Sequence, residues 1–199
     1  MIICIIGSGG REHAICKSVA LSHKVKKIYC VPGNAGTQQI AENINLDIDN
    51  FDEILKFLKD AKVDLVVVGP EKPLVDGIVD FLEKNNIKVF GPRKIPSQLE
   101  GSKTFTKNIC KKYNIPTANF GVFEKKENTI KFLKNSKFPI VIKADGLAAG
   151  KGVYISKNLS EANDAVNEIF NGKFGVAKKI LVEEFLNGEE MSFFIVCDG

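Results

Sequence analysis

The sequence predicts an α/β protein in which a doubly wound parallel sheet comes first and an α+β region follows. Two observations lead to this prediction. Over the first hundred residues, short continuous apolar runs such as residues 2–6 and 63–68 alternate with stretches of helical periodicity. Continuous apolar runs are typical of strands that are buried on both faces, as in a parallel sheet. Glycine or proline follows each run, so each predicted strand has a turn signal at its end.

In the first half, the apolar runs predict strands at residues 2–6, 27–31, 63–68 and 87–90. Helices are predicted between them, at residues 11–21, around 51–58 and from Pro73 to about Lys84. The helix around 51–58 has the clearest pattern, because its apolar residues recur at spacings of three and four. Pro73 is expected to open the last helix, since proline is tolerated in a first turn. Strand and helix therefore alternate as in a doubly wound domain.

The second half changes this rhythm and begins with a basic helix that carries Phe105, Ile109 and Tyr113 on one face. Further helices are predicted at residues 129–135 and around 159–169. Strands are predicted at residues 122–123, 139–143, 153–156, 180–183 and 191–197. We place the domain boundary within residues 92–100 and assign residues 1–98 and 99–199 to the two domains.

Composition excludes several classes of protein. The 199 residues are 44% hydrophobic and 26% charged, the formal net charge is +4, and Arg11 and Arg93 are the only arginines. A dedicated nucleic-acid-binding protein usually clusters its basic residues and favours arginine. The five cysteines form no C-x-x-C pair, which argues against a zinc site or a disulfide framework and favours a reducing compartment. The amino terminus lacks the basic lead of a signal peptide, and no apolar run approaches the roughly 20 residues that cross a bilayer. We therefore expect a cytoplasmic protein without membrane or nucleic-acid partners.

A first glycine loop, at residues 7–13, joins a predicted strand to a predicted helix. It is not a dinucleotide fingerprint, which needs glycine where Glu12 stands and an acidic residue about 20 positions further on. The backbone N–H groups of a helix N-terminus can still bind an anion, and Arg11 stands beside them. The alternative is a tight turn that binds no ligand.

A second loop, at residues 143–152, is rich in glycine and alanine and has lysines at both ends. A Walker A motif would need glycine where Asp145 stands, serine or threonine where Gly152 stands, and a helix afterwards. Here a strand is predicted afterwards instead. Such a loop can close over phosphates like a lid, with backbone N–H groups and lysines as donors. The alternative is a mobile hairpin without a ligand.

A third stretch, at residues 181–190, runs from a predicted strand into a short acidic hinge. Backbone N–H and C=O groups at such a strand end can bind the edge of an adenine ring. Glu190, seven residues beyond Glu183, can accept hydrogen bonds from both ribose hydroxyls. Alone, an acidic run of this kind is more often a solvated turn.

Five strings together resemble the ATP-grasp superfamily and, within it, the phosphoribosylamine–glycine ligase family. They are GSGGREHA at 7–14, PGNAGT at 32–37, GPEKPL at 69–74, LEGSK at 99–103 and VIKADGLAAGKGV at 141–153. The resemblance runs along the whole chain, and the string at 141–153 is its most specific part. It implies an ATP-dependent ligase of purine biosynthesis that joins glycine to 5-phosphoribosylamine through a glycyl phosphate.

The resemblance also implies roles for individual residues. Lys143 would be catalytic. The residues that would bind ATP are Lys103, Lys143, Asp145, Gly146, Gly150, Lys151, Gly152, Glu183, Glu184, Phe185, Leu186 and Glu190. The residues that would face phosphoribosylamine are Gly9, Gly10, Arg11, Glu12, His13, Gly33, Asn34, Gly36 and Glu71. His13 is expected to orient groups by hydrogen bonds rather than to transfer a proton.

One part of the family pattern is absent from this sequence. The resemblance implies a second ATP-grasp lobe that carries ligands for Mg²⁺ or Mn²⁺, and we expect that lobe beyond residue 199. On this expectation the chain holds no metal ligand, is nearly inactive alone and is the first part of a longer ligase, with a monomer favoured. The alternatives are another ATP-grasp carboxylate–amine ligase and a non-catalytic nucleotide-binding module.

Overall fold

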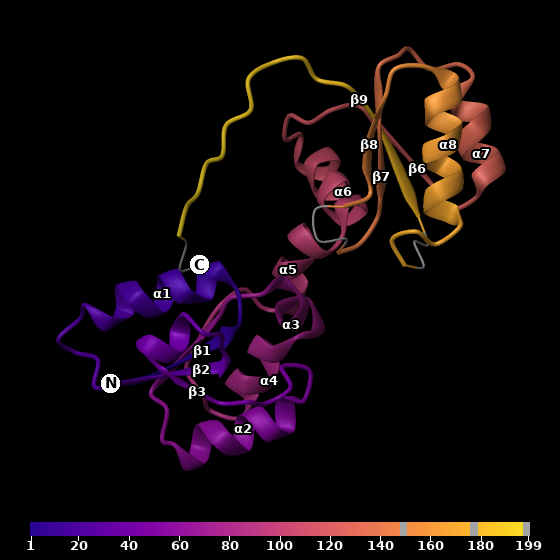
Figure 1. Cartoon of the computed structure of the whole chain (residues 1–199). Helices are drawn as coiled ribbons and strands as arrows, with labels where there is room; N and C mark the ends of the chain where they lie inside the picture. Colours follow the sequence, from indigo (N-terminus) through magenta and orange to yellow (C-terminus); the bar gives the residue numbers. More distant parts are fainter. Residues whose placement is uncertain (148–150, 176–178, 197–199) are drawn as a thin grey trace. The chain divides into compact units, whose positions relative to one another are not determined.

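A computed structural model describes residues 1–147, 151–175 and 179–196. The chain divides into two compact units, Met1–Gly101 and Ser102–Gly199, each of which is treated by itself below (Figure 1). The first unit is built on a parallel sheet and the second on an antiparallel sheet. The predicted fold class, a doubly wound parallel sheet followed by an α+β region, is confirmed.

The parallel sheet of the first unit has the strand order β3-β2-β1-β4-β5. Its strands are β1 (Ile2–Gly7), β2 (Lys27–Pro32), β3 (Glu42–Asn43), β4 (Leu65–Val68) and β5 (Val89–Phe90). The chain builds outward from β1 to β3, returns to the centre, and builds outward on the other side through β4 and β5. β3 was not predicted, because its two polar residues form no apolar run.

The helices of the first unit depart from prediction at two places. They are α1 (Gly10–Ala20), α2 (Phe51–Asp60), α3 (Glu71–Asp76), α4 (Ile78–Lys84) and α5 (Lys94–Gly101), with a 3-10 turn η1 (Thr37–Gln39). The single helix predicted from Pro73 is wrong. The helix begins at Glu71, and Gly77, with φ +103°, ends α3 and starts α4. A left-handed residue cannot continue a right-handed helix, so the apolar periodicity spans two helices. α5 was not predicted.

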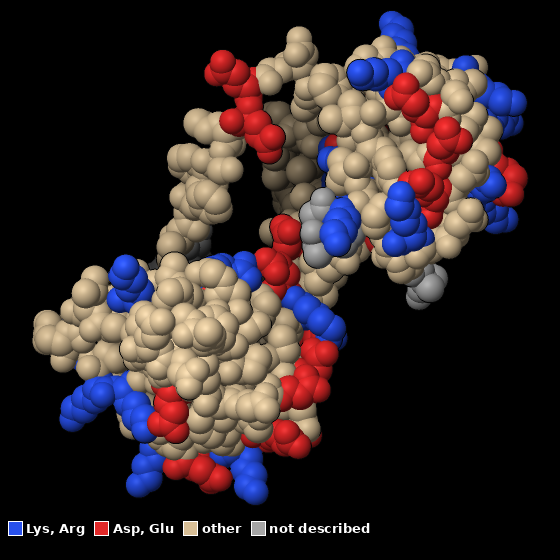
Figure 2. Space-filling model, viewed as in Figure 1, with Lys and Arg blue, Asp and Glu red and all other residues tan. Residues whose placement is uncertain are grey.

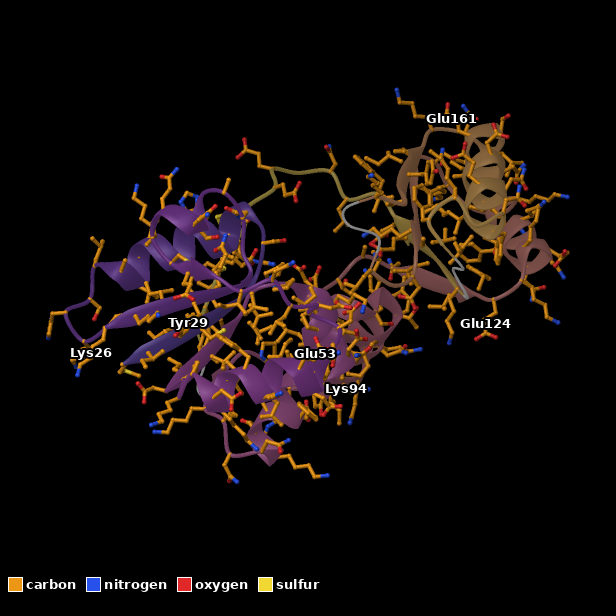
Figure 3. All side chains as sticks on the ribbon, turned by 60° about the horizontal axis from the view of Figure 1, so that its bottom comes forward. Lys26, Tyr29, Glu53, Lys94, Glu124 and Glu161 are labelled. Atoms are coloured by element: carbon orange, nitrogen blue, oxygen red, sulfur yellow. The ribbon has the colours of Figure 1, made fainter. Side chains whose placement is uncertain are left out.

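Apolar side chains of β1 alternate between the two faces of this sheet. Cys4 and Ile6 pack in a core with α2 and α4, whereas Ile3 and Ile5 pack with Cys16 of α1 on the opposite face. On the first face Tyr29, labelled in Figure 3, meets Phe57 of α2 edge-on at 5.1 Å between ring centroids. Both faces of the sheet are therefore covered, which explains the uninterrupted apolar runs.

The second unit is a four-stranded antiparallel sheet in the order β6-β9-β7-β8. Its strands are β6 (Phe120–Phe123), β7 (Ile140–Ala144), β8 (Val153–Ser156) and β9 (Ile180–Glu184). Its helices are α6 (Lys103–Tyr113), α7 (Lys126–Leu133) and α8 (Leu159–Phe170). Helices α7 and α8 cover one face, where Ile140, Ile142 and Val166 are buried in the core. The opposite face carries Val141 and Lys143, because side chains alternate along β7.

The strand predicted at residues 191–197 is wrong over the described residues 191–196, which form no strand. Their large side chains are exposed, with Phe194 at 89% and Met191 at 82%. β9, the strand that precedes them, already has β6 and β7 as neighbours, and residues 191–196 pair with neither of the outer strands, β6 and β8. The apolar pattern therefore predicts a strand that residues 191–196 do not form. Cys197 lies outside the described residues.

Three of the cysteines are small buried thiols. Cys4, Cys16 and Cys30 are free and buried, and desolvation raises the pKa of all three, that of Cys16 to about 12. A thiol whose pKa is raised holds little thiolate and reacts slowly. These residues therefore contribute packing rather than chemistry.

The surface carries charges of both signs. On the face shown in Figure 2, basic and acidic side chains are interspersed over each unit. No helix of the described residues is both long enough and apolar enough to cross a membrane.

We predict that Gly69→Ala destabilises the first unit. A Cβ at residue 69 would lie 2.0 Å from Glu12 Oε1, and Glu12 is buried and cannot move without losing its hydrogen bonds. Overpacking of this kind costs about 1–3 kcal/mol. Urea denaturation of the protein measures the effect. Gly10→Ala is the matched control, because nothing lies within 4 Å of its added Cβ. Equal unfolding midpoints for the two variants would contradict the prediction.

Candidate functional site

In the first unit, three candidate loops meet at one edge of the parallel sheet. β1, β2 and β4 end at Gly7, Pro32 and Val68, and their carboxyl ends lie at the same edge because the strands are parallel. The winding of the sheet reverses between β1 and β4. In doubly wound folds, ligands bind outside the carboxyl ends of the strands at this reversal.

Glu12 is turned into the protein beneath the first glycine loop. Its side chain is 3% exposed and accepts hydrogen bonds from Gly9 N at 2.6 Å and from Arg11 Nε at 2.9 Å. A Cβ on Gly7 or Gly69 would collide with this carboxylate. Glycine is therefore needed at both strand ends to let two backbones approach it. The structure gives Glu12 the role of holding the loop, while its predicted contact with substrate stays a prediction.

Arg11 connects the loops that follow β1 and β4. Its guanidinium donates to Glu71 Oε1 at 2.8 Å through NH1, and both side chains are about half exposed. The hydrogen bond from Arg11 lowers the pKa of Glu71, so this carboxylate is ionised at neutral pH. Arg11 thus stands at the sheet edge with its orientation fixed by Glu12 and Glu71.

The turn at residues 33–37 is bonded to the first glycine loop. Asn34 Nδ2 donates to the carbonyl oxygens of Ser8 at 2.8 Å and Gly9 at 3.2 Å. Asn34 Oδ1 accepts from the backbone N–H groups of Gly36 at 2.7 Å and Thr37 at 3.0 Å. The Asn34 amide therefore fixes the distance between two loops that were predicted to share a ligand.

His13 and the buried Thr37 complete this arrangement. A Cβ on Gly36 would lie 2.8 Å from His13 Nδ1, so the imidazole rests against the turn. Thr37 is 0% exposed and donates to Asn43 Oδ1 at 2.8 Å, while Asn43 Nδ2 donates to the carbonyl of Asn34 at 2.7 Å. Sequence analysis missed Thr37 and Asn43. The Asn-x-x-Thr spacing at 34–37 is the signal that could have found Thr37.

In the second unit, a buried carboxylate lies between two lysines. Glu183 of β9 is 6% exposed, and its Oε2 lies 3.0 Å from Lys143 Nζ of β7 and 3.3 Å from Lys107 Nζ of α6. The register pairs Val141 with Glu183, which places both strands' charged side chains on the same face of the sheet. Sequence analysis missed Lys107. Its position four residues after Lys103 on a predicted helix is the signal that could have found it.

Asp145 ties the start of the second glycine loop to helix α6. Its Oδ1 accepts from the backbone N–H groups of Gly146 at 3.1 Å and Thr104 at 3.2 Å, and Ser102 Oγ lies 3.2 Å from Oδ2. Lys103 Nζ donates to the carbonyl of Gly146 at 2.9 Å. A carboxylate is favourable at a helix N-terminus. Asp145 thus holds Lys103 beside the loop.

The far end of this loop is set by Gly152, whose φ of +82° suits glycine. A Cβ there would lie 3.3 Å from Ala144 Cβ and from the ring of Phe174, so the chain passes close to both. Lys151 is exposed. Gly150, a predicted ATP-binding residue, lies outside the described residues.

The predicted adenine hinge spans Glu183 to Leu186. Within it, the carboxylate of Glu184 accepts from Asn119 N and Nδ2, both at 3.0 Å. These hydrogen bonds lower the pKa of Glu184. Phe185 is 39% and Leu186 64% exposed, and Glu190 is exposed as well. The hinge is therefore open to a ligand, while Glu183 and Glu184 are engaged within the protein.

A pocket of ≈ 340 Å³ lies beside the end of β9. Its lining includes Val182, Glu183 and Glu184 of β9 together with Phe132 of α7. Lys143 and Lys103 are not among its lining residues. We therefore do not assign this pocket to nucleotide phosphates. Among the described residues, no group of three or more His, Cys, Asp or Glu side chains is arranged to hold a metal ion.

Comparison with known proteins matches the two units to two domains of one family. Residues 1–100 match the family "Phosphoribosylglycinamide synthetase, N domain", and residues 101–199 match "Phosphoribosylglycinamide synthetase, ATP-grasp (A) domain". The phosphoribosylamine–glycine ligases of Brucella melitensis and Mesorhizobium japonicum are 48% and 50% identical over 200 residues. These matches cover 100% of the chain and 47% of each relative, so the chain spans about half the length of these curated relatives.

A solved structure is also similar. The phosphoribosylamine–glycine ligase of Thermotoga maritima superposes with a TM-score of 0.78 at 36% identity, covering 95% of this chain and 45% of the other. The chain therefore belongs to the phosphoribosylamine–glycine ligase family, also called the phosphoribosylglycinamide synthetase family.

Proposed function

We propose that the chain binds ATP and 5-phosphoribosylamine within an ATP-dependent ligase that joins the amine to glycine. In this proposal residues 1–98 form the phosphoribosylamine-side domain and residues 99–199 the N-terminal part of the ATP-grasp domain. The observation that carries the proposal is the placement of Lys103 and Lys143 at the start of the 145–152 loop, one on helix α6 and one on β7.

The reaction requires activation of a poor acyl donor. Transfer of the γ-phosphoryl group of ATP to the glycine carboxylate gives glycyl phosphate and ADP. The amine then attacks the acyl carbon, phosphate leaves with the bonding electrons, and a proton is lost from nitrogen. Charge on the transferring phosphoryl group must be stabilised by cations and N–H donors. We assign this role to Lys103, Lys143 and the backbone N–H groups of the loop at residues 146–152, of which 148–150 lie outside the described residues.

The first unit has the features that suit the other anionic substrate. The first turn of α1 presents backbone N–H groups at the sheet edge, and Arg11 stands beside them. A helix N-terminus and a guanidinium both favour a phosphate group. Asn34 lies on the neighbouring turn and His13 of α1 rests against that turn, so both side chains can orient the ribose. Glu12 fixes the orientation of Arg11 by accepting a hydrogen bond from its Nε.

The family also implies a divalent cation, Mg²⁺ or Mn²⁺, which would offset charge on the phosphates. The described residues offer no ligand set for such an ion. We therefore assign the binding and orientation of the anionic groups to the lysines and arginine, and no step to a metal held by these residues.

We predict that Lys143→Met weakens ADP binding by about tenfold to a hundredfold, the range for losing a charge-assisted hydrogen bond. The fold should persist, because the Lys143 side chain is 27% exposed and lies on the face of the sheet opposite α7 and α8. Calorimetric titration of the complete gene product with ADP measures this. Lys131→Met on the exposed surface of α7 is the matched control. Unchanged ADP affinity in Lys143→Met would refute the phosphate role.

We also predict that Arg11→Gln raises the KM for phosphoribosylamine by about tenfold or more, since bonds to charged groups contribute about 1.5–3 kcal/mol. Affinity for ADP should not change, because no nucleotide group is assigned to Arg11. Arg93→Gln, the other arginine, is the control, because Arg93 pairs with Glu83 on the surface. Steady-state ADP formation with glycine as co-substrate gives the KM for phosphoribosylamine, and calorimetric titration gives the affinity for ADP. Activity with bicarbonate in place of glycine would point instead to a different ATP-grasp ligase.

A further inference from the structure

Lys107 is a buried charge to which the proposed function gives no role. Among the described residues, the buried charged side chains are Glu12, Lys107 and Glu183. Burying an ammonium group is unfavourable unless it has hydrogen-bond partners and an opposite charge. A leucine at this position would avoid that cost. The presence of a buried lysine at residue 107 therefore needs a functional or structural explanation.

The partners of Lys107 hold it firmly in place. Its Nζ donates to Thr117 Oγ1 at 2.7 Å and to the carbonyl of Ala118 at 3.3 Å, and it lies 3.3 Å from Glu183 Oε2. The ring of Phe120 lies 5.5 Å from the ammonium group. The side chain is 10% exposed, so Lys107 is fixed inside the unit and is not placed to follow a ligand.

Lys143 has the opposite character. It shares the same oxygen, Glu183 Oε2, at 3.0 Å, but its side chain is 27% exposed. Two ammonium groups thus face one carboxylate, and the three side chains together carry one net positive charge. If Lys107 were absent, Lys143 would be the only cation of the described residues within salt-bridge distance of Glu183. Lys143 would then be held to Glu183, because leaving an unpaired buried charge is strongly unfavourable.

We propose that Lys107 is a positioning residue that neutralises Glu183, so that Lys143 keeps its charge for a nucleotide phosphate. This inference rests on the proposed function, since it assumes that Lys143 contacts phosphate. Lys107 itself touches no ligand and acts through the shared carboxylate. Its effect should therefore appear only with nucleotides that carry phosphate, and only while residue 183 is charged.

The test compares ADP with adenosine in the complete gene product. The dissociation constant of adenosine divided by that of ADP isolates the phosphate contribution, because loss of an adenine contact affects both ligands. Weaker binding of the ADP phosphates lowers this ratio. We expect Lys107→Met to weaken ADP binding by about tenfold while adenosine binding stays the same, the size of one charge-assisted hydrogen bond. Lys111→Met, one turn further along α6 and exposed, is the matched control and should leave the ratio unchanged.

A second substitution separates charge balance from packing. In the Lys107→Met, Glu183→Gln double variant the carboxylate is gone, so Lys143 is no longer restrained and the ratio should return to that of the unaltered protein. The double variant buries no unpaired charge, and it therefore serves as the test even if Lys107→Met alone fails to fold. A single variant with an unchanged ratio, or a double variant with a low ratio, overturns the inference.

The two proposals fail in different ways. If Lys143→Met leaves ADP affinity unchanged, the phosphate role of Lys143 is wrong and the proposed function fails with it. If Lys143→Met weakens ADP binding but the double variant with Lys107→Met and Glu183→Gln keeps a low ratio, only the role of Lys107 is wrong.

Discussion

Burying a carboxylate is favourable only when cations or N–H groups surround it, and this constraint organises the candidate site of each unit. Glu12 in the first unit and Glu183 in the second are both almost inaccessible to solvent. Glu12 is satisfied by the backbone of Gly9 and by Arg11, and Glu183 by two lysines. Each carboxylate thereby fixes the position of a cation at the edge of its unit.

The two units solve this problem with different backbones. In the first, Gly7 and Gly69 let two strand ends approach Glu12, so the carboxylate bridges the point where the winding of the sheet reverses. In the second, antiparallel pairing of β7 with β9 places Lys143 and Glu183 on one face, and α6 supplies Lys107. The cation that faces outward differs as well. Arg11 suits bidentate recognition of a phosphate, whereas Lys143 acts as a compact charge.

The sequence predicts those features that depend on local pattern. Apolar runs locate β1, β2 and β4, and glycine-rich strings locate both loops. The failures have a common cause, because each depends on what a segment meets in the folded protein. Gly77 splits a helix through its backbone conformation, and residues 191–196 form no strand because none of them pairs with a strand of the sheet, although β6 and β8 are its outer strands. Lys107 resembles any other lysine of a basic helix until β9 brings Glu183 against it.

The acidic residues of the motifs show most clearly how a residue pattern differs from a list of contacts. Glu12, Asp145 and Glu184 all belong to strings that point to ligand binding, yet each carboxylate is bonded to backbone N–H groups of its own unit. A site for phosphates cannot place carboxylates against its ligand without repulsion. These three carboxylates can serve such a site only indirectly, by holding loops and orienting cations. The groups that face the ligand must then be arginine, lysine and backbone N–H groups. On the proposed function, the motifs thus divide between residues that contact the anion and residues that hold the first group in place.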